Sequence, residues 1–310
     1  MAEVRVIGAG VIGLSCAVRL LEAGHTVTVL TEKDPQQTTS RVAGALWYPY
    51  LAAPVDRVTA WGVQTLAELV RLAEQEPASG VHLVDGTEVG VGQLPDPAWA
   101  TDVIDFRRVD GRDGEPGGGW AFAAPLADMS VYLGWLVSRV EGRGGRIERR
   151  RLQAVPDDGV PTVVAAGLGA RELLPDPSMS TARGQILLLR QCGLTRWALD
   201  QTGEQPVYVF PRERDIVVGG TSDPEDTRTA PVPAIGAAVL DRAVKLVPEL
   251  AGAQIREHRV GLRPVRPAVR LEAETLGSTP VVHCYGHGGA GVTLSWGCAD
   301  EAASLLQAGL

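Results

Sequence analysis

The sequence predicts an α/β fold, α+β overall, in which a Rossmann-like dinucleotide-binding domain is interleaved with an antiparallel-sheet domain. Two observations support this prediction. A strand, a glycine-rich turn, a helix and a second strand open the chain, and strand-rich segments separate later pieces of the same kind. We expect the first domain to comprise residues 1–54, 129–182 and 275–310, and the antiparallel-sheet domain to comprise residues 55–128 and 183–274.

The glycine-rich turn lies within residues 4–13, which read Val-Arg-Val-Ile-Gly-Ala-Gly-Val-Ile-Gly. Gly8 allows the tight turn, Gly10 lets the backbone approach a pyrophosphate, and Gly13 lets the helix pack closely on the strand. The N-terminus of that helix offers unpaired N–H groups to phosphates. Glu32 follows after the next apolar run, where a carboxylate accepts hydrogen bonds from a ribose. The pattern indicates a dinucleotide site; a glycine-rich turn without a ligand is the alternative.

Hydrophobic periodicity and turn residues place the remaining elements. In the longest expected helix, the side chains of Trp61, Thr65, Leu69 and Leu72 share one face. We expect helices at residues 11–23, 56–73, 129–141, 233–246 and 292–305. We expect strands at residues 4–8, 27–31, 81–84, 88–91, 103–106, 146–155, 162–167, 185–189, 207–210, 216–218, 256–262 and 281–285. Loops are expected at residues 114–119 and 286–291.

The composition is that of an ordinary globular protein. The 310 residues are 45% hydrophobic and 21% charged, which suits one or two domains with a large core. The net charge of −8 argues against nucleic acid and anionic membranes as partners. No apolar run reaches the ~18 residues of a membrane span. Arg149, Arg150 and Arg151 form a basic run that we expect at the exposed end of a strand.

The cysteines and histidines predict neither a disulfide framework nor a metal site. The four cysteines lack CxxC spacing, and the five histidines form no pattern suited to a metal ion. Reduced thiols and the lack of a recognisable targeting segment favour a cytoplasmic protein. The sequence does not fix the oligomeric state, and a homodimer is compatible with it.

A segment rich in small and hydroxyl residues follows the second expected strand. Thr38, Thr39 and Ser40 precede Val42-Ala43-Gly44-Ala45-Leu46-Trp47. Such residues let the backbone run close to a planar ring and a phosphate. A Ser/Thr-rich turn that caps a helix is an equal alternative for this segment alone.

Prolines stiffen a segment that carries two arginines, Gly261-Leu262-Arg263-Pro264-Val265-Arg266-Pro267. Arginine on a stiff strand suits bidentate capture of a carboxylate. Such a charge-assisted bond contributes about 1.5–3 kcal/mol. The alternative is an arginine that pairs with a structural aspartate or glutamate. We expect that pairing for Arg266, and less so for Arg263.

A second glycine-rich segment, Tyr285-Gly286-His287-Gly288-Gly289-Ala290-Gly291, leads into an apolar helix. Its four glycines allow the backbone to approach a flat ligand closely, and the helix directs its positive end toward that ligand. We expect His287 to shape the loop rather than to act as a base.

Together these segments resemble the D-amino-acid oxidase family, FAD-dependent flavoenzymes of the glutathione-reductase-like class. The resemblance covers nearly the full length of the chain. It rests on residues 6–15, Leu46-Trp47-Tyr48-Pro49-Tyr50, Arg183-Gly184-Gln185, Arg263-Pro264-Val265-Arg266-Pro267 and the stretch from His283 to Ala299.

The resemblance implies a role for each matching residue. Arg263 is expected to bind the substrate carboxylate, and the hydroxyl of Tyr208 to make a second contact with it. The backbone carbonyl of Gly289 is expected to accept a hydrogen of the substrate amine, and Tyr48 to line the substrate pocket. The residues expected to hold FAD are Gly8, Ala9, Gly10, Val11, Ile12, Gly13, Glu32, Lys33, Thr38, Thr39, Ser40, Ala43, Gly44, Ala45, Leu46, Val164, Gly167, Gly286, Gly288, Gly289, Ala290, Gly291, Val292 and Thr293.

The chain departs from the family's pattern at the substrate end. Glu204 replaces the lid tyrosine of the mammalian relatives within a short segment, so we expect a more open pocket. Gln201 stands where relatives specific for D-aspartate carry an arginine, which argues for neutral or apolar substrates. Tyr48 replaces a frequent glutamine, and Cys284 replaces an asparagine.

The resemblance implies FAD-dependent oxidative deamination of neutral D-amino acids. A hydride passes from Cα to flavin N5, the imino acid hydrolyses to a 2-oxo acid and ammonia, and O2 reoxidises the flavin with release of hydrogen peroxide. The expected partners are therefore a small D-amino acid and O2. A glycine or sarcosine oxidase of the same fold and a non-catalytic FAD-binding protein remain alternatives.

Overall fold

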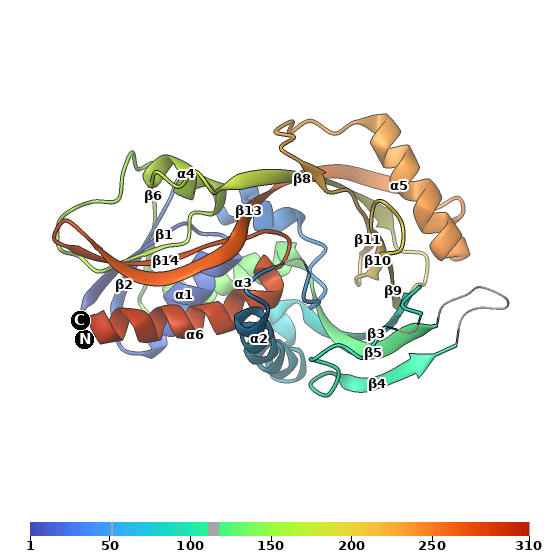
Figure 1. The fold of residues 1–310 in the computed structure, drawn as a ribbon, viewed down its shortest axis with the longest axis horizontal. Helices are drawn as coiled ribbons and strands as arrows, with labels where there is room; N and C mark the ends of the chain where they lie inside the picture. The colour runs from blue at the N-terminus through green and yellow to red at the C-terminus, as the bar shows by residue number, and fades with distance from the viewer. Residues whose placement is uncertain (51, 93, 111–117, 310) are drawn as a thin grey trace.

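One long mixed sheet runs through the molecule (Figure 1). The computed structural model describes residues 1–50, 52–92, 94–110 and 118–309. Among these residues the strands follow the order β4-β5-β3-β9-β10-β11-β8-β13-β14-β7-β1-β2-β6, with β12 beside β8. The predicted mixed α/β class is confirmed. Both termini lie at the same end of the molecule (Figure 1).

Five parallel strands form the end of the sheet that carries the termini. β1 pairs with β2 on one side and with β7 on the other, and β6 and β14 extend the sheet on either side. β1, β2, β7 and β14 are largely buried, as expected for parallel strands that are covered on both faces, whereas β6 at the edge of the sheet has no buried residue. Their bounds are Glu3–Ile7 (β1), Thr26–Thr31 (β2), Arg146–Arg149 (β6), Thr162–Val164 (β7) and Thr279–His287 (β14).

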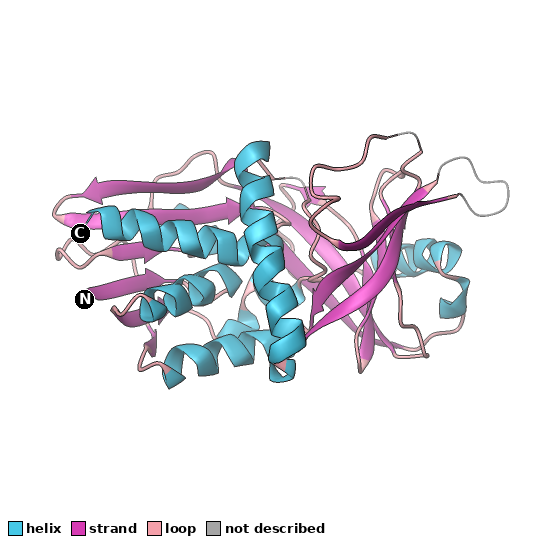
Figure 2. Ribbon diagram, turned by 90° about the horizontal axis from the view of Figure 1, so that it is seen from below, coloured by secondary structure: helices cyan, strands magenta, loops and turns pink. Residues whose placement is uncertain are grey.

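The longer helices cover this parallel part and its junction with the rest of the sheet. α1 packs against α3 and α6, and α2 packs against α6. α2 is seen end-on in Figure 1 and runs across the molecule in Figure 2. The bounds are Val11–Glu22 (α1), Val55–Gln75 (α2), Met129–Gly142 (α3) and Gly291–Gly309 (α6).

Antiparallel pairing dominates the other end of the sheet. α5 lies against β8, β10 and β11 on the outer flank of this part (Figure 1). The strands are Val81–Val89 (β3), Ile104–Val109 (β4), Gly119–Ala127 (β5), Ser180–Arg190 (β8), Trp197–Asp200 (β9), Val207–Pro211 (β10), Asp215–Gly219 (β11) and Asp223–Pro224 (β12), and α5 is Pro233–Leu246. The short helix α4 is Ala170–Leu173, and single helical turns lie at Pro35–Gln37 (η1), Thr39–Val42 (η2), Pro77–Ser79 (η3), Gly167–Gly169 (η4) and Pro248–Leu250 (η5).

The strand β13 (Ile255–Leu276) joins the two parts of the sheet. Its first half, up to Val265, pairs with β8, and its second half pairs with β14. The sequence predicted a shorter strand at 256–262 followed by a stiff segment. Pro264 and Pro267 lie within β13, at the place where the strand changes its partner. A residue without an N–H donor is tolerated there because the ladder to β14 is interrupted.

Several strand predictions were wrong in their extent. The expected strands at 81–84 and 88–91 are one strand, β3, and the strand expected at 146–155 ends at Arg149. β5 and β9 were not expected, because β5 is rich in alanine and contains Pro125 while β9 has four residues. Of the expected loop at 114–119, residues 114–117 lie outside the described residues.

A single set of buried apolar side chains connects the two parts of the sheet. It includes Leu14 of α1, Leu66 of α2, Phe122 of β5 and Trp296 of α6. The side chains expected on one face of the longest helix, among them Trp61, are all buried. Within the described ranges, no helix is long and apolar enough to cross a membrane.

Candidate active site

A cavity of about 530 Å³ is lined by residues from both parts of the sheet. All five parallel strands end at this cavity, as is typical of ligand sites in sheets of this kind. The lining residue that follows each strand is Gly8 after β1, Glu32 after β2, Arg150 after β6, Ala165 after β7 and Gly288 after β14. The antiparallel part closes the cavity with residues of β8, β9, β10 and β13.

The glycine-rich turn after β1 has the geometry that the sequence predicts. Gly8 has a φ of 111°, and a Cβ there would lie 2.4 Å from the carbonyl oxygen of Ala165. A Cβ on Gly13 would lie 1.9 Å from the carbonyl oxygen of Gly8, so the helix packs directly on the turn. Gly10 faces the cavity as the N-cap of α1 and has no side chain to cap it, so first-turn N–H groups beyond that of Val11 are left for a ligand.

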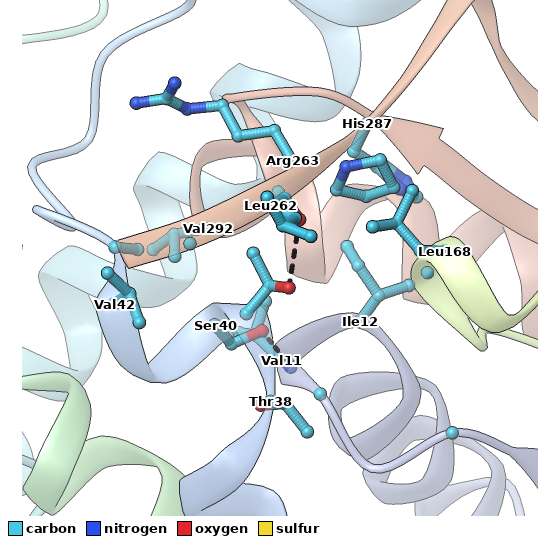
Figure 3. Close-up of a pocket in the computed structure, with 18 of the residues that line it drawn as sticks. Val11, Ile12, Thr38, Ser40, Val42, Leu168, Leu262, Arg263, His287 and Val292 are labelled. Atoms are coloured by element: carbon cyan, nitrogen blue, oxygen red, sulfur yellow. Dashed lines mark hydrogen bonds between the residues drawn. The ribbon is translucent and has the colours of Figure 1, made fainter. Parts of the chain in front are cut away.

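Hydroxyl residues after β2 brace this turn. The N–H of Val11 donates to Oγ of Ser40 at 3.0 Å, and Oγ1 of Thr39 donates to the carbonyl of Leu262 at 3.0 Å (Figure 3). The segment therefore ties the start of α1 to β13. Thr38 also lines the cavity, so the three hydroxyl residues share one wall.

A charged cluster lies at the cavity end next to β2 and β6. Glu32 and Lys33 line it, as expected for residues near a ribose. Arg151 also lines it, with Nε 3.8 Å from Glu32 and Nη2 3.2 Å from Glu172. The sequence placed the basic run at an exposed strand end without connecting it to a site. The connection follows from the parallel pairing of β2 with β6, which no local pattern reveals.

Arg263 occupies the other end of the cavity, away from Val11 and Ser40 (Figure 3). Its Nη1 donates to the carbonyl of Thr221 at 2.8 Å, and a Cβ on Gly184 would lie 2.6 Å from Nη2. Among the described residues Arg263 forms no ion pair.

Arg266, three residues further along β13, differs from Arg263 as the sequence predicts. Its Nε lies 2.9 Å from Oδ2 of Asp176, a buried carboxylate, and its Nη1 donates to the carbonyl of Ala268. Burial opposes ionisation of Asp176, but hydrogen bonds from Ser178, Tyr285 and Arg266 lower its pKa to about 2. Arg266 therefore has a structural partner.

Two tyrosines and a glycine surround Arg263. The ring of Tyr208 stacks on Phe210, with centroids 4.6 Å apart, and a Cβ on Gly219 would lie 2.1 Å from its Cζ. Burial raises the pKa of Tyr208, and the charge of Arg263 opposes this shift. The same two effects act on Tyr50. A Cβ on Gly289 would lie 3.0 Å from the ring of Tyr50, so these groups form one cluster.

Tyr50 was not among the expected site residues, although it lines the cavity. Its spacing from Tyr48 was an available signal, because residues two apart in an extended segment share a side of the chain. Gln201, noted only as a departure from the family's pattern, also lines the cavity, whereas Glu204 is exposed and does not.

Behind Tyr48 lies a buried carboxylate that the sequence did not reveal. The hydroxyl of Tyr48 donates to Oε2 of Glu88 at 2.7 Å, and Nε2 of Gln201 donates to Oε1 of Glu88 at 2.7 Å. Glu88 is 4% exposed. Its partners are 40 and 113 positions away in the sequence, so only the folded chain brings them together.

His287 lies at the end of β14 and lines the cavity near Leu168 (Figure 3). Burial lowers its pKa to about 4, so the imidazole is neutral at physiological pH. Its Nε2 has no hydrogen-bond partner among the described residues. The following loop is tied to β13, because the N–H of Gly288 donates to the carbonyl of Pro264 at 2.8 Å. Nε2 of His287 is itself buried behind the cavity wall.

Most residues expected to hold FAD line the cavity, including Gly167, Gly291, Val292, Thr293 and the segment Ala43–Leu46. Four do not. Gly13 packs on Gly8, Val164 is fully buried within β7, Gly286 lies against Arg266, and Ala290 is fully buried. Their contribution is to the shape of the surrounding backbone.

The chain matches a known family over nearly its whole length. Residues 3–305 match the family model described as FAD dependent oxidoreductase. A D-amino-acid oxidase of Rubrobacter xylanophilus is 46% identical over 320 residues, covering 100% of this chain and 97% of the relative. A D-amino-acid oxidase of Streptomyces coelicolor is 41% identical, covering 98% of this chain and 97% of the relative. A crystal structure of glycine oxidase from Bacillus cereus shares the fold, with a TM-score of 0.81 at 19% identity, and the match covers 99% of this chain and 98% of that one. The chain therefore belongs to the family of FAD-dependent oxidoreductases.

Proposed function

We propose that this protein catalyses the FAD-dependent oxidative deamination of neutral D-amino acids. The observation that carries the proposal is the cluster of Arg263, Tyr208 and Tyr50 at the cavity end opposite the glycine-rich turn. Arg263 has no ion pair among the described residues, and a cation beside two hydroxyls suits the carboxylate of an amino acid. The names of the relatives support the same substrate class.

The residues of the cavity fit FAD. The helix N-terminus beyond Gly10 and the hydroxyl of Ser40 suit the pyrophosphate, and Glu32 suits the ribose. The N-terminus of α6 at Gly291 suits polar groups of the flavin ring. When bound, FAD supplies the two-electron oxidation, in which a hydride leaves the substrate Cα and the electrons reach O2 to give hydrogen peroxide.

The protein's own contribution is orientation. The guanidinium of Arg263 and the hydroxyl of Tyr208 hold the carboxylate, and the carbonyl of Gly289 accepts a hydrogen of the amine. With the side chain in the remaining space, three fixed points select one enantiomer. No base is needed when the amine binds in its neutral form, and His287, neutral and buried, is not placed as one. Catalysis then depends on holding the reacting atoms in line.

Anaerobic mixing of the flavin-loaded protein with single amino acids tests this proposal. D-alanine and D-valine are expected to bleach the flavin absorbance, and L-alanine is expected to leave it unchanged. In air the same D-amino acids are expected to yield hydrogen peroxide and ammonia in equal amounts. A preference for glycine or sarcosine over every D-amino acid would instead support a glycine oxidase. Flavin that no amine bleaches would support a non-catalytic protein.

The setting that we propose is the cytoplasm, in agreement with four cysteines that are free in the structure. Cell fractionation tests this location. Light scattering measures the oligomeric state directly, and a mass of two chains would support the homodimer with which the sequence is compatible.

A further inference from the structure

The side chains of Glu88, Leu199 and Tyr208 form a row across three neighbouring strands. Glu88 of β3 is paired with Leu199 of β9, and Leu199 is paired with Tyr208 of β10. Paired residues present their side chains on the same face of a sheet. Strands are about 4.8 Å apart, so the backbone at Glu88 is about 10 Å from the backbone at Tyr208. Glu88 thus lies to one side of the proposed carboxylate site.

The O–H group of Tyr48 and both N–H groups of Gln201 are engaged in hydrogen bonds within this group of three side chains. Tyr48 has one O–H, which it donates to Oε2 of Glu88 at 2.7 Å. Gln201 has two N–H groups on Nε2, of which one is donated to Oε1 of Glu88 at 2.7 Å and the other to Oη of Tyr48 at 3.2 Å. The polar atoms that remain for a ligand are acceptors, namely Oε1 of Gln201 and the free lone pair of Tyr48.

Glu88 also places a negative charge behind this wall. Each of its oxygens accepts one hydrogen bond, the arrangement of an ionised carboxylate. Burial, which has the largest effect, and the charge of nearby Asp200 raise the pKa of Glu88 above its usual value, although the hydrogen bonds of Tyr48 and Gln201 act in the opposite direction. Among the described residues no cation pairs with it, and in a partly dry site such a charge acts more strongly than in water.

We propose that Glu88 is a specificity-determining residue that acts through Tyr48 and Gln201. It fixes the two side chains so that they present acceptors, and its charge repels anions. The pocket therefore selects substrates whose side chains donate hydrogen bonds, such as carboxamides, and rejects side-chain carboxylates. This inference rests on the proposed oxidation of D-amino acids and adds the residue that sets the choice among them.

D-asparagine and D-aspartate test the inference because they are nearly equal in shape and differ in charge. In the wild-type protein, kcat/KM is expected to be at least 100-fold higher for D-asparagine. In Glu88→Gln the charge is lost, and the amide of Gln201 is free to turn its N–H groups toward the cavity. The kcat/KM ratio of D-aspartate to D-asparagine is then expected to rise at least 10-fold, mainly through a lower KM for D-aspartate.

Asp85→Asn is the matched control. Asp85 lies on the same strand, is exposed, and contacts Arg196 at the surface at 3.9 Å. This variant removes one negative charge outside the cavity. Its kcat/KM ratio of D-aspartate to D-asparagine is therefore expected to equal that of the wild type. An unchanged ratio in Glu88→Gln, or an equal rise in both variants, would overturn the inference while D-asparagine oxidation still stood.

If Glu88→Gln does not bind flavin, inhibition of the wild-type protein tests whether the pocket rejects a second carboxylate. Succinate and succinamate can each place one carboxylate on Arg263, and their far groups differ in charge and in the N–H donors of the amide. Succinamate is expected to bind at least 10-fold more tightly. Equal binding, or tighter binding of succinate, would overturn the inference. A failure to oxidise any D-amino acid would refute the proposed function separately.

Discussion

Arg263 and Arg266 differ through their partners rather than through their chemistry. Both lie on β13 within the proline-containing segment, but Asp176 holds Arg266 and no carboxylate among the described residues holds Arg263. The resemblance implied this difference, because it assigns the carboxylate to Arg263 alone, whereas the stiffness of the segment is common to both arginines. It could not predict Glu88, because a buried glutamate is recognised only by its partners on other strands. Single residues are therefore predictable where a local motif carries them.

A pH dependence of stability follows from His287. Its pKa is about 4 in the folded protein and about 6.5 when unfolded. Between these values the unfolded chain binds a proton that the folded protein does not. The free energy of unfolding therefore falls as the pH drops from 6.5 toward 4, by up to about 3 kcal/mol from this group.

The variant His287→Gln tests this prediction. The fall in melting temperature between pH 7 and pH 4.5 is expected to be smaller in the variant than in the wild type. His283, whose pKa burial also lowers, contributes in the same direction in both proteins. An equal fall in both would show that His287 is not the group responsible.

At the scale of secondary-structure elements, the helices were predicted best. α2, α3, α5 and α6 lie within a few residues of their expected bounds, because an apolar face is a local signal. The strands were harder, since their burial depends on which neighbours they acquire. β5 is buried on both faces, so its sequence, which is rich in alanine and contains Pro125, does not alternate between apolar and polar residues.

The junction of β1 and α1 gives a prediction at this scale. Gly13→Ala would place a Cβ 1.9 Å from the carbonyl of Gly8, so the turn must shift. The variant is expected to lose most of its bound flavin and at least 2 kcal/mol of stability, the order of an overpacked core site. Flavin content after purification and the melting temperature measure both effects.

Gly134→Ala is the control for this experiment. Gly134 lies within α3, and a Cβ there would have no atom within 4 Å. Because alanine is the better helix former, this variant is expected to keep its flavin and to gain up to about 1 kcal/mol of stability. Equal flavin loss in both variants would refute a specific role for the turn.

At the scale of the whole molecule, the sheet and the core are shared by both parts. β13 is paired with β8 in its first half and with β14 in its second half, and one set of buried side chains includes Leu14 and Phe122. The sequence predicted two interleaved domains with a ligand between them. Their boundaries stay a prediction, because a strand that belongs to both parts leaves no single point of division.

Cooperative unfolding is the expected consequence of this shared sheet. Loss of tryptophan burial, loss of secondary structure and release of flavin are expected to occur at the same urea concentration. Fluorescence and circular dichroism on one set of samples measure all three. A separate, earlier transition in secondary structure or tryptophan fluorescence, with flavin still bound, would show that the antiparallel part unfolds by itself.

The claim on which the proposed function depends is that Arg263 anchors the substrate carboxylate, and a pair of lysine variants tests it most directly. Lysine keeps the positive charge but cannot form the bidentate hydrogen bonds of the guanidinium with a carboxylate. For Arg263→Lys, KM for D-alanine is expected to rise about 10- to 100-fold, the equivalent of about 1.4–2.7 kcal/mol, with flavin still bound. For Arg266→Lys, whose arginine pairs with Asp176, stability is expected to fall while KM is unchanged. An unchanged KM in Arg263→Lys would contradict the account.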